Sequence, residues 1–173
     1  FPGLNFDPAE LGEAISHGLE HGVRTLVAIN TFMRAGAEGL WTKAVDDAVA
    51  LGAHALILAD LGLLAYAAER YPDQRLHLSV QAAASNAEYI GYLVDAFGIK
   101  RAVLPRVLTI SEVAAISRQV RCETEVFVFG GLCVMEEGRC SLSSYATGLS
   151  PNMQGVCSPA SHVRYRQVGD EMV

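Results

Sequence analysis

The sequence has little basic charge, and what it has is not gathered into a long cluster. It contains 13 Lys and Arg against 19 Asp and Glu, which gives a formal net charge of −6. Its basic-leaning stretches, at 100–106 and 164–166, are both short. Affinity for nucleic acid comes mainly from clustered Lys and Arg that contact phosphates. The acidic balance therefore counts against a nucleic-acid-binding protein.

A secretory signal and a long hydrophobic run are also missing. Residues 1–5 read FPGLN, without the basic start and apolar stretch of a signal peptide. The most apolar stretch, 53–68, is interrupted by His54 and Asp60, so it predicts a buried strand followed by a helix rather than a membrane span. We therefore expect a cytoplasmic protein. Because the sequence starts without Met, we also expect a fragment or a processed chain.

The sequence lacks the closely spaced cysteine pairs that zinc sites favour. Its four cysteines are Cys122, Cys133, Cys140 and Cys157. The last three lie in a segment rich in Gly and Ser, and in a cytoplasmic chain this indicates metal or redox chemistry rather than disulfides. Their spacing alone leaves a second interpretation open, in which they are buried cysteines that pack like small hydrophobic side chains.

The first 130 residues alternate between strand-like and helical patterns. Asp7 and Pro8 predict a helix start, because Asp is a good N-cap and Pro suits the first helical position. Short apolar runs predict strands at 25–29, 55–59, 76–80, 102–104 and 126–129. Helical patterns lie between them at 41–51, 61–70, 86–97 and 110–120. Strands that alternate with helices in this way indicate βαβ units and a parallel sheet.

The predicted fold class is α/β, with parallel β/α units that form part of a TIM-like (β/α) barrel. A whole barrel needs eight units and about 250 residues, whereas only five strands are predicted here, so an open α/β sheet is the alternative. We expect residues 1–130 to form the partial barrel. Residues 131–173 would form an irregular cysteine-bearing segment that continues the same domain.

Polar residues follow the predicted strands at the edge where α/β proteins gather their chemistry. Asn30, Asp60, Gln81 and Arg106 each come just after a strand, and the fifth strand runs into Gly130. The alternative for each is a helix cap or a buried hydrogen bond, and Asp60 fits an N-cap well. Asn30, Gln81 and Arg106 are the predicted substrate-binding residues. Arg106 is the candidate partner for a carboxylate, because its fork matches two oxygens; a salt bridge to an acidic helix is the alternative.

The segment from Glu125 onward resembles the signature of peptidase family U32. That pattern is Glu-x-Phe-x-x-Gly, then Leu-Cys, four residues, Gly-x-Cys and x-Leu-Ser. The residues that fit it are Glu125, Phe127, Gly130, Leu132, Cys133, Gly138, Cys140, Leu142 and Ser143. Gly131 departs from it, since Ser or Ala is more usual at that position.

Within the family the chain is most similar to the branch that serves oxygen-independent ubiquinone biosynthesis. The similar stretches include 3–6, 28–32, 55–61, 66–72, 79–82, 103–108, 137–140, 143–145, 150–152 and 157–160. RNA-hydroxylating relatives usually carry a Cys-x₃-Cys at the third cysteine position. Here Cys157 is followed by Ala160 and Ser161, which favours the ubiquinone branch.

The resemblance implies a [4Fe–4S] cluster in which Cys133, Cys140 and Cys157 are three of four ligands. The fourth would lie beyond the end of this sequence, so the cluster would be incomplete in the chain as given. Cys122 falls outside the motif and is predicted not to be a ligand. The resemblance further implies an anaerobic hydroxylase component that forms a heterodimer with a second family member. Its small molecules would be a ubiquinone precursor and prephenate, the latter as oxygen donor.

Other functions remain open from the sequence. Relatives hydroxylate RNA, against which the acidic balance and the missing Cys-x₃-Cys count. The family name implies a peptidase, but the chain contains neither a Gly-x-Ser-x-Gly elbow nor a His-Glu-x-x-His motif. A scaffold whose cluster is structural or senses oxygen is a further possibility. His17 and His21 are spaced to share a helix face, but without a zincin glutamate between them we interpret that face as solvated.

Overall fold

A parallel β-sheet organises the chain, and its strands follow one another in sequence order. The computed structural model describes residues 6–130, 133, 135, 137, 139–156, 167–168 and 171–172. The sheet has the order β1-β2-β3-β4-β5, and every neighbouring pair is parallel. Its strands are β1 (Leu26–Ile29), β2 (Ala55–Leu58), β3 (Arg75–Leu78), β4 (Arg101–Val103) and β5 (Glu123–Glu125). The predicted α/β class with parallel units is confirmed.

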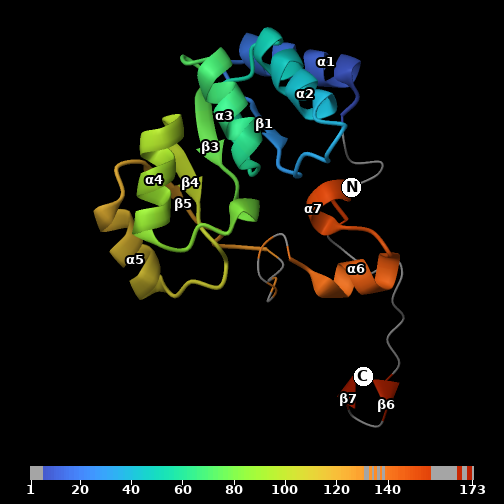
Figure 1. The fold of residues 1–173 in the computed structure, drawn as a ribbon, viewed down its shortest axis with the longest axis vertical. Coiled ribbons are helices and arrows are strands. Elements are labelled where there is room, and N and C mark those ends of the chain that lie inside the picture. The colour runs from blue at the N-terminus through green and yellow to red at the C-terminus, as the bar shows by residue number, and fades with distance from the viewer. Residues whose placement is uncertain are drawn as a thin grey trace.

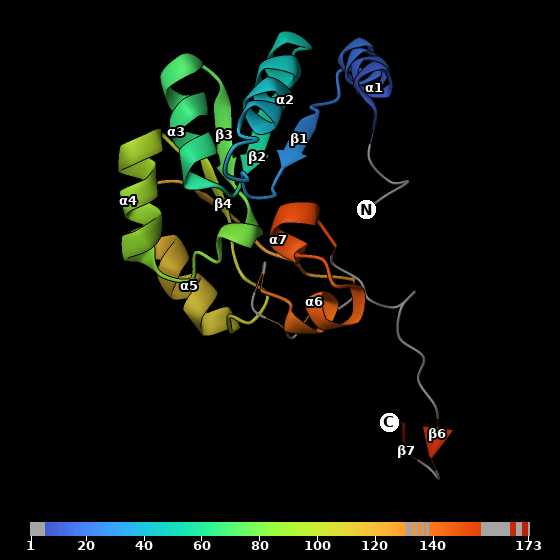
Figure 2. The ribbon, with the colours of Figure 1, turned by 45° about the vertical axis from the view of Figure 1, so that its right-hand side comes forward.

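Helices before and between the strands lie on one face of the sheet (Figures 1 and 2). They are α1 (Pro8–Glu20), α2 (Gly39–Ala50), α3 (Leu61–Arg70), α4 (Ala87–Phe97) and α5 (Ile110–Gln119). Right-handed crossovers between strands in sequential order place every helix on the same side. An open sheet of this kind has the arrangement of a contiguous piece of a (β/α) barrel.

Local signals in the sequence explain where the helices begin. Asp7 caps α1 through hydrogen bonds from the backbone N–H groups of Ala9 and Glu10, and Pro8 occupies the first helical position. Thr109 forms a capping box with Glu112 at the start of α5. Gly98 ends α4 with a positive φ of 68°, a conformation that favours glycine.

The prediction for the fifth strand was wrong by three residues. The sequence predicted 126–129 because that run is apolar, but the strand is Glu123–Glu125, and Val128 and Phe129 are 90% and 100% exposed. Pairing between oppositely charged residues explains the shift. Glu123 lies opposite Arg101 in the register, and the carboxylates of Glu123 and Glu125 both form salt bridges with the Arg101 guanidinium.

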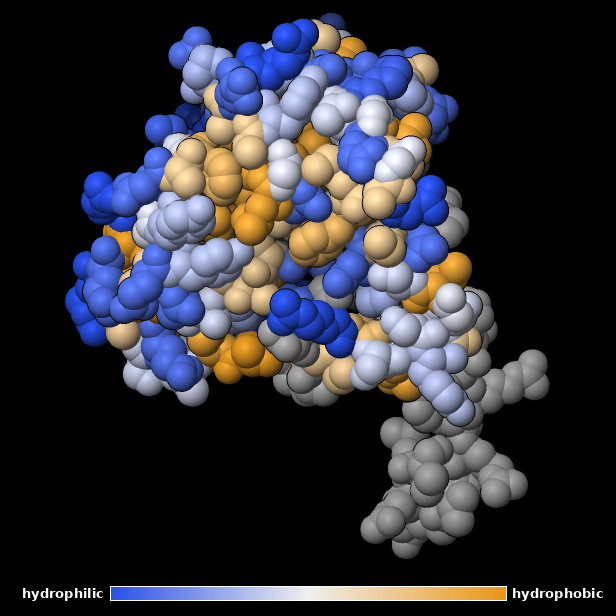
Figure 3. All heavy atoms as spheres, in the orientation of Figure 1, coloured by the Kyte–Doolittle hydropathy of each residue, from blue (hydrophilic) through white to orange (hydrophobic). Residues whose placement is uncertain are grey.

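The hydrophobic core fills the space between the sheet and the helices. Alternation along each strand sends Leu56, Leu58, Leu76 and Leu78 to the same face, and all four are buried. Helix residues complete the cluster, among them Val45, Leu63, Leu64, Ile90, Leu93 and Ile116. Figure 3 shows a mixed outer surface on this side, where apolar side chains around α3 lie among hydrophilic ones.

The opposite face of the sheet carries a charged network on β3, β4 and β5, beside apolar side chains such as Ile57 and Val103. Arg75 and Arg101 both bind the Glu123 carboxylate, and the Nε of Arg75 donates to Nε2 of His77 at 2.9 Å. His77 is buried, and its Nδ1 has no partner among the described residues. Burial, followed by the positive charges of Arg101 and Arg75, lowers the pKa of His77 from 6.5 to about 4.

Two short helices sit below the carboxyl ends of the strands, namely α6 (Ser141–Thr147) and α7 (Pro151–Gln154). Figures 1 and 2 both show them at that edge of the sheet, below the strands, whereas α1 lies at the top of both views. The backbone N–H of Phe32, just after β1, donates to the carbonyl oxygen of Asn152 in α7 at 2.8 Å. A 3₁₀ turn at Val80–Ala82 follows β3 at the same edge.

Near the end of the chain, β6 (Gln167–Val168) and β7 (Glu171–Met172) pair antiparallel. Among the described residues, the helices all fall short of the length and apolar character needed to cross a bilayer.

Candidate functional site

Cys140 holds a defined position at the N-terminus of α6. It is the N-cap residue, and its Sγ accepts hydrogen bonds from the Ser143 backbone N–H at 3.4 Å and from the Ser143 hydroxyl at 3.1 Å. Ser143 is fully buried, so its hydroxyl is held close to the sulfur. Hydrogen bonds of this kind stabilise negative charge on sulfur, which is what a metal-bound thiolate needs. These contacts make Cys140 a candidate metal ligand.

The other cysteines differ in how they are placed. Cys133 is half-buried in the loop between β5 and α6, with its Sγ 4.0 Å from the Met135 carbonyl oxygen. Cys157, the third predicted ligand, lies outside the described residues. Cys122 precedes β5, at the opposite edge of the sheet, and packs against the hydrophobic core. Burial raises the pKa of the Cys122 thiol, which disfavours the thiolate that metals bind.

A buried ion pair holds the cysteine-bearing segment against the sheet. Arg106 follows β4, and its Nε and Nη2 donate to the two carboxylate oxygens of Glu137 at 2.8 and 2.7 Å. The backbone N–H of Arg106 also donates to Glu137, which is only 4% exposed. The Arg106 guanidinium lies 4.6 Å from the centre of the Phe127 ring. A bidentate salt bridge stacked on an aromatic ring fixes both the separation and the relative orientation of the guanidinium and the carboxylate.

A polar pocket of about 240 Å³ opens beside Cys140. Besides Cys140, the residues that line it are Arg139, Ser141, Ser144, Ser150, Pro151 and Asn152. The Oδ1 atom of Asn152 is buried and has no hydrogen-bond partner within the part of the chain that the structure describes. Because buried polar atoms normally have partners, this oxygen is able to accept a hydrogen bond from a bound molecule.

The predicted substrate-binding residues all reach the same edge. Asn30 is half-buried directly after β1, and Gln81 lies in the 3₁₀ turn after β3. The Gln81 side-chain Oε1 is buried without a partner among the described residues, as is Asn152 Oδ1. Arg106 is bound to Glu137, so the salt bridge considered from the sequence exists, although its partner comes from the cysteine-bearing segment rather than from a helix.

Asp60 has the structural role that its sequence context predicted. Its Oδ1 accepts from the Leu63 backbone N–H as the N-cap of α3, and its Oδ2 accepts from the Met33 N–H at 3.2 Å. One carboxylate thus starts a helix and also ties down the loop after β1.

Sequence reasoning did not single out Glu137, Ser143 and Asn152 as functional residues. The Ser143 contact follows from its position three residues after Cys140, the spacing of an N-cap. Glu137 lies 31 residues from Arg106, and no local pattern predicts that pairing. A second, larger pocket of about 620 Å³ is mainly apolar and lies between α1, β1 and α2, away from the cysteines.

Comparison with known proteins identifies a matching family and several relatives. The family model described as "Peptidase family U32" matches residues 2–172. The chain is 34% identical to the tRNA hydroxylation protein P of Escherichia coli (strain K12) over 170 residues, which cover 97% of this chain and 37% of that protein. It is 29% identical to the 23S rRNA 5-hydroxycytidine C2501 synthase of the same organism, over 94% of this chain and 24% of that protein. The chain therefore spans about a third or less of the length of these relatives.

A solved structure has the same arrangement of elements. The structure titled as that of the U32 peptidase Mk0906 superposes with a TM-score of 0.59 and 19% identity, over 69% of this chain and 51% of that one. At this identity the likeness concerns the fold.

Proposed function

Because the chain belongs to peptidase family U32, we propose that it is part of an oxygen-independent hydroxylation protein whose cysteines hold a [4Fe–4S] cluster. The observation that supports this best is the sulfur of Cys140, which accepts two hydrogen bonds from Ser143 beside a polar pocket at the carboxyl edge of the sheet. Cys133 and Cys157 are the other proposed ligands within the chain, and a fourth cysteine would complete the set.

The residues present suit such a group. Thiolates are the usual ligands of iron–sulfur clusters, and N–H and O–H groups directed at sulfur tune the cluster's potential. When bound, the cluster supplies redox chemistry that side chains alone do not provide. The salt bridge between Arg106 and Glu137 holds the ligand segment at the sheet edge, next to the place where a substrate would bind.

The leading substrate hypothesis is the aromatic ring of a ubiquinone precursor. In this hypothesis the protein is UbiU-like, works as a heterodimer with a UbiV-like partner, and takes its oxygen atom from prephenate. The buried amide oxygens of Gln81 and Asn152 would accept hydrogen bonds from hydroxyl groups of these molecules. Asn30 would line the same edge. Arg106 is the proposed carboxylate partner, because its guanidinium carries several N–H donors.

The first test is to measure iron and acid-labile sulfide per chain, with an absorption spectrum, after strictly anaerobic purification or reconstitution. We expect Cys133→Ala and Cys140→Ala to abolish the cluster and Cys122→Ala to retain it, because Cys122 packs against the core at the opposite edge. If the chain alone binds no iron, the same measurement on a longer chain that carries the fourth cysteine shows whether that cysteine is required for the cluster. Absence of a cluster in both would contradict the proposal.

Hydroxylation of RNA is the second candidate, and the names of the relatives favour it. The net charge of −6 does not, and within the described residues Arg75, Arg101, Arg106 and Arg121 are all paired with acids. The two candidates separate in one experiment. Extracts of cells with and without the intact protein are compared by mass spectrometry for hydroxylated quinone precursors and for hydroxylated nucleosides, after anaerobic growth. Loss of only the nucleosides would reject the quinone hypothesis.

A further inference from the structure

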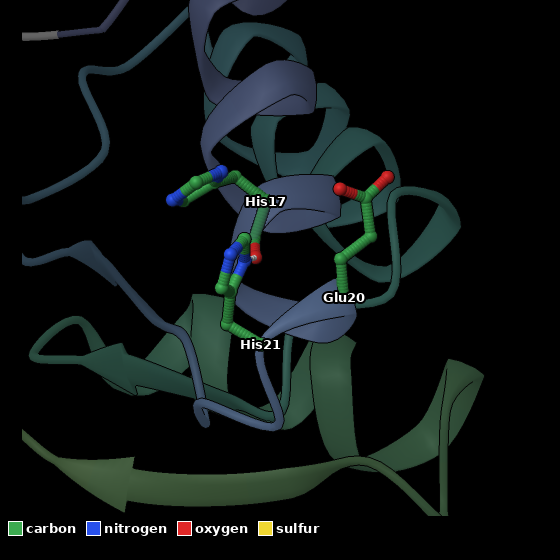
Figure 4. A group of neighbouring side chains, drawn as sticks. All are labelled: His17, Glu20 and His21. Carbon is green, nitrogen blue, oxygen red and sulfur yellow. Dashed lines mark hydrogen bonds between the residues drawn. The ribbon is translucent and has the colours of Figure 1, made fainter.

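The last turn of α1 brings together three side chains that commonly bind metal ions. These are His17, Glu20 and His21, and all three are exposed. Each offers one ligand atom, and these atoms all lie within 4.8 Å of one another. Figure 4 shows the two imidazole rings next to each other on the helix surface, with the Glu20 carboxylate projecting from the same turn. Glu20 directly precedes the second histidine, whereas the zincin motif has its glutamate directly after the first, so that motif does not describe this group.

A hydrogen bond prepares His21 to bind a metal. Its Nδ1 lies 2.8 Å from the carbonyl oxygen of His17. Because a carbonyl only accepts, Nδ1 must carry the proton and donate it. In neutral His21 the lone pair therefore lies on Nε2, which is free to bind a cation. Metal-binding histidines usually donate their second ring nitrogen in this way, which fixes both the tautomer and the ring orientation.

The position of the group also favours a cation. His21 is the C-cap of α1, and the carbonyl groups at a helix C-terminus carry partial negative charge. The two rings are 4.2 Å apart between centroids and are tilted by 39°. A tetrahedral ion with bonds of about 2.0–2.1 Å needs ligand atoms about 3.3 Å apart. The ligand atoms, which lie within 4.8 Å of one another, would therefore have to approach by up to about 1.5 Å, and His17 and Glu20 are exposed side chains that can rotate.

We propose that His17, Glu20 and His21 form a binding site for a divalent transition-metal ion of the zinc class. Two imidazoles and one carboxylate form a ligand set that zinc uses in proteins, and they leave a coordination position open to water or to another ligand. The α1–β1 connection lies at the amino edge of the sheet, whereas the cysteine-bearing segment lies at the carboxyl edge (Figure 1). The site is therefore separate from the proposed cluster and does not depend on it.

Nuclear magnetic resonance of the imidazole nitrogens during a Zn²⁺ titration tests the proposal, because it reports on each histidine separately. We expect the ring signals of His17 and His21 to shift together during the first added equivalents. The signals of His54, which is exposed and lies outside the group, serve as the internal control and should not move with them. Zn²⁺ bound by cysteines elsewhere does not imitate this result.

Matched variants test the carboxylate. Glu20→Gln should weaken Zn²⁺ binding at His17 and His21 roughly tenfold or more, because it replaces a charged carboxylate ligand by a weaker, neutral amide oxygen. Glu69→Gln removes the same charge from an exposed position in the last turn of another helix, α3, and should change the affinity less than about twofold. Equal effects of the two variants would overturn the three-ligand site. So would shifts at His54 that match those at His17 and His21, or no shifts at all.

Discussion

The sheet with its helices and the segment at its carboxyl edge are stabilised in different ways. Apolar burial holds the first, where Leu56, Leu58 and Leu64 are completely buried. A few polar contacts hold the second. Among the described residues they include the salt bridge between Arg106 and Glu137 and the hydrogen bond from Phe32 to Asn152. The edge segment carries Cys133 and Cys140, while the sheet and its helices bury most of the large apolar side chains of the described residues.

This difference bears on function. Regions with few buried apolar contacts open locally at a lower free energy than the core does, and binding sites are commonly drawn from them. A segment attached by ion pairs and single hydrogen bonds is able to adjust to a cofactor or substrate while the sheet stays folded. The comparison predicts that changes in the sheet affect the whole domain, whereas changes in the edge contacts affect α6 and α7 alone.

The largest effect is expected from Leu64→Ala. Leu64 is fully buried between α3 and the sheet, so truncation removes apolar contacts and leaves a cavity, at a cost of about 2–5 kcal/mol in the free energy of unfolding. Urea denaturation followed by circular dichroism measures it. Leu61→Ala is the matched control, because Leu61 lies in the same helix but is 43% exposed, and it should cost less than about 1 kcal/mol. Equal losses would contradict the assignment of the core.

The charged face of the sheet predicts a dependence on pH. The unfolded state protonates His77 near pH 6.5, whereas the folded state does so only near pH 4. Below pH 6.5 the unfolded state therefore binds more protons, and stability falls as the pH is lowered. Between pH 7 and pH 5 we expect a loss of about 2 kcal/mol.

His77→Gln removes this titration and retains an acceptor for Arg75. Its free energy of unfolding, measured by urea denaturation at pH 7, 6 and 5, should therefore change less with pH than that of the unchanged chain. Arg101 lowers the pKa of Glu123 by hydrogen bonding, and the stability this contributes is lost below about pH 4.5, outside the window. A variant with the same slope as the original would show that His77 is not responsible.

The fold was largely predictable because its signals are local. The helix predicted at 61–70 matches α3, since Asp60 defines its start and the apolar period its length. The fifth strand was misplaced because an apolar run was taken as the strand, whereas cross-strand pairing of Arg101 with Glu123 and Glu125 decides the register. Apolar content predicts burial, whereas the position of β5 depends on salt bridges to the neighbouring strand, which apolar content does not reveal.

The candidate site was less predictable, because its contacts join distant parts of the chain. The sequence placed Arg106 at the correct edge, but its pairing with Glu137, 31 positions further along, depends on how the chain between them folds. Local spacing does predict the contact between Cys140 and Ser143, which are three residues apart. It also predicts that Glu20 lies near His17 and His21. Those two arrangements could have been found from helix geometry alone.

The smallest effect, and the sharpest test of the comparison, is expected from Glu137→Gln. The amide retains an acceptor for Arg106 but loses the charge and one of the charge-assisted hydrogen bonds, which costs roughly 1 kcal/mol. The loss should be local. Amide hydrogen exchange in α6 and α7 should accelerate about fivefold, the factor that corresponds to 1 kcal/mol, while exchange in α3 and α4 stays unchanged.

The pair formed by Arg121 and Asp95 provides the control. It is also an ion pair between distant residues, but its side chains are 70% and 64% exposed, so water competes for both charges. Arg121→Gln should therefore change stability by less than about 0.5 kcal/mol and leave exchange in α6 and α7 unaffected. If Glu137→Gln instead accelerated exchange throughout the sheet, the edge segment would be part of the same cooperative unit. Because the ion pair of Glu137 is buried and that of Arg121 is not, only the former has the strength to hold a segment in place.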